Sequence, residues 1–220
     1  MKQDNFYYML AGLLVLLLLA PAIAHMFPAG SGLIIQIALM TVMVIGVWSL
    51  QADSRFFIIG IILASIGTIL SVVNYFQDSR IISLITLSVL LVFCVLSAIE
   101  AMKQILFSGR IDANKLVGSI CIYLLLGIIW SLFYIFIAYF TADAFTGLTL
   151  GTDNNTPWEL ELIYYSFVTL TTLGYGDINP VSAYARSLAY LEAICGQFYI
   201  AILVASLVSS LISDKQQEMK

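Results

Sequence analysis

Long apolar runs separated by short polar breaks are the main feature of this chain. Six of these runs are long enough to cross a bilayer core about 30 Å thick as helices. They cover residues 6–24, 33–50, 56–73, 81–98, 116–140 and 184–212. The breaks between the first four runs are only a few residues long, so neighbouring helices should pack as antiparallel hairpins. The pattern therefore predicts an all-α polytopic membrane protein with six transmembrane helices.

A shorter helix is predicted between the fifth and sixth runs. Thr156 is suited to the N-cap, Pro157 to the first helical position, and Glu159 to a capping box with Thr156. A helix from Pro157 to Thr171 would be about 22 Å long, which is too short to cross the bilayer. Such a re-entrant helix should enter the membrane and turn back, with protein or a water-filled cavity covering the irregular backbone that follows.

The segment TLTTLGYGD lies at the end of this short helix. Its glycines, Gly174 and Gly176, are two residues apart, and glycine adopts positive φ without a steric penalty. Alternating right- and left-handed dihedrals would bring successive carbonyl oxygens onto one side of the backbone, whereas an ordinary strand alternates between two faces. Thr172 can add its hydroxyl oxygen at the inner end, while Leu173 and Tyr175 point away. This pattern is suited to replacing the water around a cation with protein oxygens.

The segment resembles the selectivity filter of potassium channels of six-helix topology, with Leu173 in place of valine. The resemblance implies that K+ is the permeant ion and is held by oxygens of Thr172, Leu173, Gly174 and Tyr175, with Gly176 completing the filter. One chain supplies one filter strand, and a ring of carbonyls around an ion needs about four. We therefore expect a homotetramer with its pore on the symmetry axis.

Three residues near the filter are given a supporting role by the same resemblance. Tyr164 and Tyr165 stand where many potassium channels have a pair of tryptophans around the filter. Asp177 matches the acidic residue that bonds to the second member of that pair, here Tyr165. Tyrosine can still donate a hydrogen bond from its hydroxyl, so the resemblance implies that selectivity is kept, while the inactivation behaviour stays open.

The first four helices are predicted to lack gating charges. A voltage sensor carries several basic residues through the membrane field, because one charge crossing 100 mV is worth only about 2.3 kcal/mol. The fourth run, residues 81–98, contains no arginine or lysine, and Arg80 lies at its edge. We therefore expect opening to be largely independent of voltage.

The chain divides into four parts. A voltage-sensor-like peripheral domain without gating charges comes first. It is followed by an interfacial linker helix, by a pore domain of outer helix, pore helix, filter and inner helix, and by a short cytoplasmic tail. These parts cover residues 1–98, 99–115, 116–213 and 214–220. The tail leaves no room for a C-terminal ligand-binding domain, so we expect none.

Two residues of the sixth run stand out. Gly196 falls at the place of the hinge glycine in the inner helix of the resembling family, which implies a gating hinge. Close packing of a small residue is the alternative. Glu192 is an ionisable residue at membrane depth, where a charged and unpaired carboxylate costs about 3 kcal/mol. It either bonds to the pore helix behind the filter or titrates and makes conduction sensitive to pH.

The composition argues against a soluble globule and against an enzyme. The chain is 61% hydrophobic and 10% charged, with a mean hydropathy of +1.01. His25 is the single histidine, and the sequence has no nucleophile–base set. We expect no cofactor apart from K+ as the permeant ion. The expected partners are other copies of the chain, membrane lipid and potassium ions, and not nucleic acid.

The basic residues predict the orientation. With the N-terminus inside, seven basic residues fall on the cytoplasmic side and only Arg80 and Arg186 fall outside, as the positive-inside rule requires. We therefore expect both termini in the cytoplasm, in a prokaryotic inner or plasma membrane. A cleaved signal peptide is the alternative for residues 6–24, because Lys2 precedes the run and a site of the A-x-A kind ends it.

The predicted function is a potassium-selective channel that conducts K+ passively through a tetrameric pore. A weakly selective cation channel is one alternative, although such a channel would typically break the Gly-Tyr-Gly pattern. A non-conducting membrane sensor is another, but it gives no reason for the run from Thr172 to Asp177. The opening stimulus stays open between membrane tension, lipid, pH at Glu192, a partner and constitutive opening.

Overall fold

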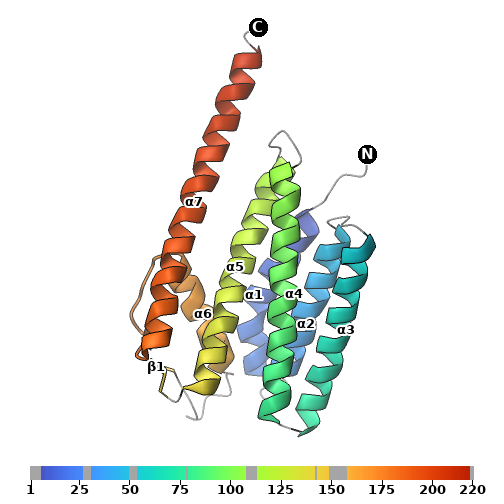
Figure 1. The fold of residues 1–220 in the computed structure, drawn as a ribbon, viewed down its shortest axis with the longest axis vertical. Helices are drawn as coiled ribbons and strands as arrows, with labels where there is room; N and C mark the ends of the chain where they lie inside the picture. The colour runs from blue at the N-terminus through green and yellow to red at the C-terminus, as the bar shows by residue number, and fades with distance from the viewer. Residues whose placement is uncertain are drawn as a thin grey trace.

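The computed structural model describes most of the chain as helices joined by short connections (Figure 1). The described residues are 6–26, 31–49, 54–77, 79–107, 113–141, 143–148 and 158–218. The helices are α1 (Phe6–Met26), α2 (Ser31–Ser49), α3 (Ser54–Gln77), α4 (Arg80–Phe107), α5 (Ala113–Phe140), α6 (Trp158–Leu170) and α7 (Ala183–Glu218). The strands are β1 (Phe145–Thr146) and β2 (Asn179–Pro180). The helical fold class predicted from the apolar runs is therefore confirmed for these residues.

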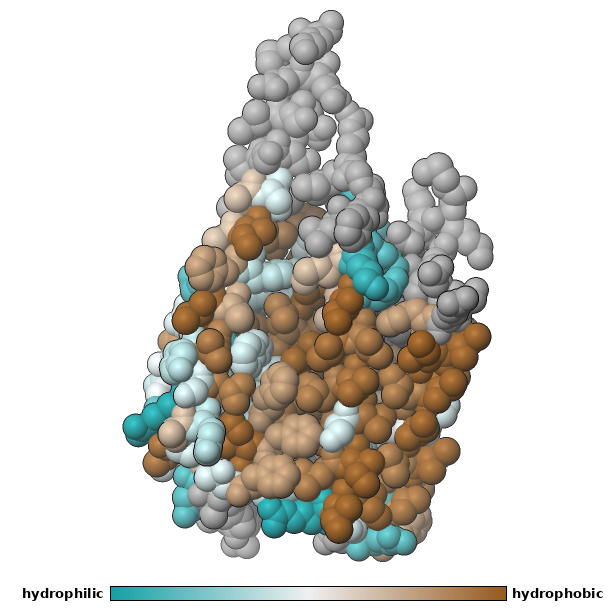
Figure 2. Space-filling model, in the orientation of Figure 1, coloured by the Kyte–Doolittle hydropathy of each residue, from teal (hydrophilic) through white to brown (hydrophobic). Residues whose placement is uncertain are grey.

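Four of the described helices are long and apolar enough to cross a membrane. They are α1, α3, α4 and α5, and α2 contains a shorter apolar stretch, Gly32–Gly46. Figure 2 shows apolar residues over the middle of one face of the molecule, with hydrophilic residues toward its lower end. Leu18 is 75% exposed and Phe76 is 80% exposed. The chain is a multi-pass membrane protein, and crossing by α2 and α7 stays a prediction.

The helices α1–α4, which we call the peripheral helices, pack on α5 of the same chain. α1 contacts both α2 and α5, and α4 contacts both α3 and α5. The buried residues of α1 recur every three or four positions, which places them on one helix face. At the start of this face the N–H of Phe6 donates to Asn114 Oδ1 over 3.0 Å, and the Phe6 ring packs over Gly118. This contact holds α1 against α5.

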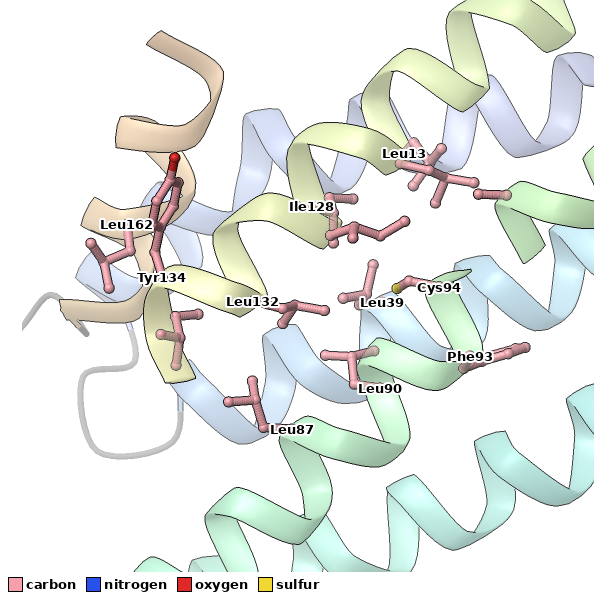
Figure 3. Close-up of a cluster of buried hydrophobic side chains, with 14 of the residues drawn as sticks. Leu13, Leu39, Leu87, Leu90, Phe93, Cys94, Ile128, Leu132, Tyr134 and Leu162 are labelled. Atoms are coloured by element: carbon pink, nitrogen blue, oxygen red, sulfur yellow. The ribbon is translucent and has the colours of Figure 1, made fainter. Parts of the chain in front are cut away.

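A buried apolar core continues between α2, α4 and α5. Figure 3 shows Leu39, Leu90 and Leu132 turned toward one another from these three helices. Leu39 is 8% exposed, Leu90 is 5% exposed and Leu132 is 4% exposed. The peripheral helices and α5 are therefore joined by a shared core and not only by the connection between α4 and α5.

The boundary between α4 and α5 differs from the prediction. We expected a separate interfacial helix over residues 99–115, but residues up to Phe107 continue α4 and the next helix begins at Ala113. No glycine or proline interrupts α4, and Ala98 and Ala101 stay buried along it. The helix therefore has no physical reason to end earlier, because the same face keeps its packing partner.

The short helix α6 lies between α5 and α7, as Figure 1 shows. Its 13 residues are too few to cross a bilayer, as the sequence predicted for the pore helix. The expected cap residues Thr156 and Pro157 lie outside the described residues. The β1–β2 pair, in which Phe145 pairs with Pro180, ties the segment after α5 to the segment before α7.

The last helix is longer than predicted. The backbone of α7 continues to Glu218, so the residues assigned to a tail from position 214 are helical, in agreement with the high helix propensity of Lys, Gln and Glu. α1 begins and α7 ends at the same end of the bundle, opposite the β1–β2 pair (Figure 1). This arrangement is compatible with both termini lying on one side of a membrane.

We expect Phe6→Ala to destabilise the protein, because Phe6 is 1% exposed at the contact between α1 and α5. Truncating a buried phenylalanine costs about 3–5 kcal/mol. Tyr8→Ala is the matched control, since Tyr8 is 59% exposed on the same helix. Thermal unfolding of the detergent-purified protein should give a clearly lower midpoint for Phe6→Ala. Equal midpoints for the two variants would contradict the packing of α1 on α5.

Candidate functional site

The backbone after α6 alternates in handedness. Thr172 has a φ of 59°, Gly174 a φ of 58° and Gly176 a φ of 79°. Among the described residues, Leu173 and Tyr175 are not in the left-handed region, so every second residue from 172 to 176 adopts it. This period of two is the alternation that brings successive carbonyl oxygens onto one side. The spacing of the two glycines predicted part of it, and Thr172 is the additional residue.

The left-handed conformation of Thr172 is held by hydrogen bonds from two directions. Its N–H donates to the Thr169 carbonyl over 2.9 Å, and Gln197 Nε2 donates to Thr172 Oγ1 over 3.1 Å. A non-glycine residue at positive φ is sterically disfavoured, so it persists where its surroundings fix it. Gln197 belongs to α7, and sequence reasoning missed it. The sequence feature that could have identified Gln197 is a polar side chain directly after Gly196 in an apolar run.

The end of α6 is closed by the segment itself. The N–H groups of Leu173 and Gly174 both donate to the Val168 carbonyl, over 2.9 and 3.3 Å. The Thr171 hydroxyl donates to the Phe167 carbonyl over 2.7 Å. The carbonyl groups in the last turn of a helix lack intrahelical partners, and these bonds supply them. The helix therefore passes into the segment without unsatisfied carbonyls at Phe167 and Val168.

The outer end of the segment is held by side chains. Tyr164 donates from its hydroxyl to Asp177 Oδ2 over 2.7 Å, and Asp177 Oδ1 accepts from the N–H of Ile178 over 3.1 Å. Asn179 Nδ2 donates to the Gly176 carbonyl over 2.7 Å. The hydrogen bond from Tyr164 lowers the pKa of Asp177 below its ordinary value, because it stabilises the carboxylate. This end is therefore fixed by an exposed carboxylate that stays charged to lower pH.

The expected partner of Asp177 was wrong. The resemblance assigned the bond to Tyr165, but the structure forms it with Tyr164. Tyr165 is 6% exposed and its ring packs edge-on against Tyr134 and Phe145, with centroid distances of 5.0 and 5.4 Å. Adjacent residues on a helix point about 100° apart, so only one of the two tyrosines can face the segment. The other one joins the aromatic core behind α6.

Gly196 lies where α7 crosses the end of α6. A β-carbon at this position would overlap the carbonyl oxygen of Leu170. Close approach of the two backbones therefore requires a glycine here, as the packing alternative predicted. α7 is one continuous helix through this position, and the role of Gly196 as a hinge stays a prediction.

Glu192 joins three helices behind the segment. It is fully buried, with Oε2 2.5 Å from the Tyr134 hydroxyl of α5 and Oε1 2.5 Å from the Ser166 hydroxyl of α6. Ser166 Oγ also lies 2.7 Å from the Gly127 carbonyl. Tyr134 and Ser166 each have one hydroxyl proton for these three contacts. A proton on the Glu192 carboxyl would let all three contacts form as hydrogen bonds.

Two comparisons bear on this region. The family model described as an ion channel (Ion_trans_2) matches residues 122–213, from within α5 to within α7. No curated protein matches the chain. The matched residues include the whole alternating segment and its supporting side chains. Residues 122–213 are therefore similar to an ion-channel domain, and this similarity favours a channel over an enzyme.

The bond between Tyr164 and Asp177 predicts a pH dependence. The bond depresses the pKa of Asp177, so the carboxylate and the contact it makes are kept as the pH falls, until the pH passes through the lowered pKa. Tyr164→Phe should raise that pKa toward its ordinary value of about 3.9. Ion flux into liposomes should then fall at higher external pH in Tyr164→Phe than in the wild type. Tyr184→Phe, which alters an exposed tyrosine at the start of α7, should leave the profile unchanged.

The network of Glu192 predicts different results for two substitutions. Glu192→Gln keeps a neutral group of similar shape, whereas Glu192→Leu leaves the buried hydroxyl of Tyr134 without this partner, at about 1–3 kcal/mol. The hydroxyl of Ser166 would still donate to the Gly127 carbonyl. The melting midpoint should therefore fall much further for Glu192→Leu. A pH response of ion flux that Glu192→Gln leaves unchanged would eliminate Glu192 as the pH-sensitive group.

Proposed function

We propose that the protein is a potassium-selective channel that conducts K+ passively through a homotetrameric pore and opens largely independently of voltage. The observation that carries the proposal is the left-handed conformation of every second residue from Thr172 to Gly176. Carbonyl oxygens of Leu173, Gly174 and Tyr175, with the carbonyl and hydroxyl oxygens of Thr172, would replace the hydration shell of the ion. No resident cofactor takes part in this mechanism, and K+ is the transported ion.

The homotetramer is supported by surfaces that the chain leaves uncovered. Leu173 is 55% exposed and Tyr175 is 67% exposed, although both point away from the carbonyl side in the proposed filter. Phe198 and Ile202 of α7 are 65% and 67% exposed. A ring of about four filter strands around an ion would bring neighbouring subunits against these side chains. Cyclic symmetry then places the pore on the axis, with each filter packed between two subunits.

Independence of voltage is supported by the charges of α4. The helix has no basic residue between Arg80 and Lys103, so its membrane-spanning part carries no gating charge. The Arg80 guanidinium donates to the backbone carbonyl of Tyr139, which fixes it at the end of α5. The membrane field therefore acts on too few charges to move this helix.

The proposed setting is a cell membrane, with both termini cytoplasmic. The distribution of basic residues supports this orientation, and the shared end of α1 and α7 is compatible with it. A weakly selective cation channel would typically break the Gly-Tyr-Gly pattern, which this chain keeps at residues 174–176. A non-conducting sensor would require no filter geometry at all. The ordered contacts at both ends of the segment favour the selective channel.

The proposal is tested by the reversal potential of the purified protein in planar bilayers under a potassium/sodium gradient. We expect reversal near the potassium equilibrium potential, with little dependence of opening on voltage. Reversal near zero would support the weakly selective channel, and absence of current at every voltage and pH would support the sensor.

A matched pair of glycine substitutions localises the selectivity. A β-carbon at Gly176 or at Gly32 meets no atom within 4 Å, but only Gly176 has a positive φ, of 79°. Gly176→Ala therefore introduces backbone strain of about 1–2 kcal/mol per subunit without a clash. We expect it to lower potassium conductance at least about tenfold, while Gly32→Ala conducts like the wild type. Equal conductance of both variants would place the filter elsewhere.

A further inference from the structure

A cavity separates the peripheral helices from the pore helix. Its volume is about 500 Å³, and residues of α2, α3, α4, α5 and α6 line it. Its apolar wall includes Leu39, Leu90 and Leu132, which Figure 3 shows facing one another. The cavity contains neither the filter segment nor Glu192. Cavities of this size between two structural units are typical of small-molecule sites.

Most polar groups that line the cavity already have partners. The hydroxyls of Ser71, Thr86 and Ser131 each donate to a carbonyl of their own helix, over 2.7, 2.8 and 2.7 Å. Ser83 donates to Asn74 Oδ1 over 3.2 Å. These groups therefore need no ligand to satisfy their hydroxyls.

Two polar side chains of the lining are different. Gln36 is the main polar residue of the apolar helix α2, and within the described part of the chain its side-chain amide has no hydrogen-bond partner. Glu159 lines the cavity from the first turn of α6, and its carboxylate is bonded to its own backbone N–H. No described basic side chain pairs with it. Arg80 donates to the Tyr139 carbonyl instead. The Glu159 carboxylate therefore lines the cavity without a basic partner among the described residues, so a cation in the cavity could form an ion pair with it.

We propose that this cavity binds a small organic ammonium ion with an apolar body, whose nitrogen donates to Glu159 and Gln36. Among the described residues, the lining has one acidic residue and no basic one, which favours a cation over an anion. The apolar body would contact Leu39, Leu90 and Leu132. A metal ion or a water cluster would use the two polar groups but leave this apolar wall without a partner.

Such a ligand would contact the peripheral domain and the pore helix at once. Gln36 belongs to α2 and Glu159 to α6, which ends at the filter segment. Binding would therefore bias the position of the pore helix against the peripheral helices, and so the opening of the channel. This regulatory consequence rests on the proposed function, whereas binding itself does not.

The binding test uses the purified full chain in nanodiscs, with 2-phenylethylammonium as the probe and uncharged 2-phenylethanol as its control. Isothermal titration calorimetry should show saturable binding of the amine and at least about tenfold weaker binding of the alcohol. Glu159→Gln should weaken amine binding at least about tenfold. Glu161→Gln is the matched control, because Glu161 is also in the first turn of α6 but does not line the cavity. Thermal unfolding identifies any variant that fails to fold, and Gln36→Leu then supplies the same test from α2.

The possible outcomes distinguish a failure of the proposed ligand site from a failure of the proposed channel function. Amine binding that Glu159→Gln and Gln36→Leu leave unchanged, or no saturable binding to the wild type, would overturn the site. Amine binding that is lost equally in Glu161→Gln would also overturn it, since the effect would then come from the charge of the helix end. Specific binding to a protein that lacks potassium selectivity would support the site and overturn only the proposed function. If the protein conducts, the change in current that the amine causes should not depend on voltage. Block of the pore by the amine would depend on voltage.

Discussion

A backbone that exchanges the water around a cation for its own oxygens must keep those oxygens on one side, and the region from α5 to α7 is suited to this constraint. Alternating handedness at Thr172, Gly174 and Gly176 meets it locally. One of these three residues is not glycine, so the conformation needs support from outside the segment. Gln197 supplies it at the inner end, and the bond between Tyr164 and Asp177 supplies it at the outer end.

The apolar surroundings set a second constraint, because a polar side chain inside the bundle needs a partner. The partners of Glu192 are Tyr134 of α5 and Ser166 of α6, so this side chain links both helices to α7. Gln36 and Glu159 line one cavity, and the Glu159 carboxylate has no basic partner among the described residues. The same rule therefore explains a structural network in one place and motivates a ligand site in the other. Both places contact α6, the helix that leads into the filter segment.

Much of the fold could be predicted from local patterns. The length of each apolar run determined where helices form, and the shortness of α6 follows from its own sequence. The predicted break after residue 98 was wrong, because the amphipathic pattern of α4 changes there but its packing face continues to Ala101. Charge along a helix marks where the surroundings change from lipid to water. It does not mark where the helix ends, since helices end at poor helix formers or where packing stops.

The sequence by itself determined the helical type of the elements, the position of the short helix α6 and the glycines of the segment after it, since hydrophobic length and glycine spacing are local properties. Only the tertiary structure decided which tyrosine meets Asp177, which groups surround Glu192, and that the peripheral helices pack on the pore of their own chain. These outcomes depend on the relative rotation and height of helices that are far apart in sequence. That geometry follows from the fit of whole faces and is not encoded in any one segment.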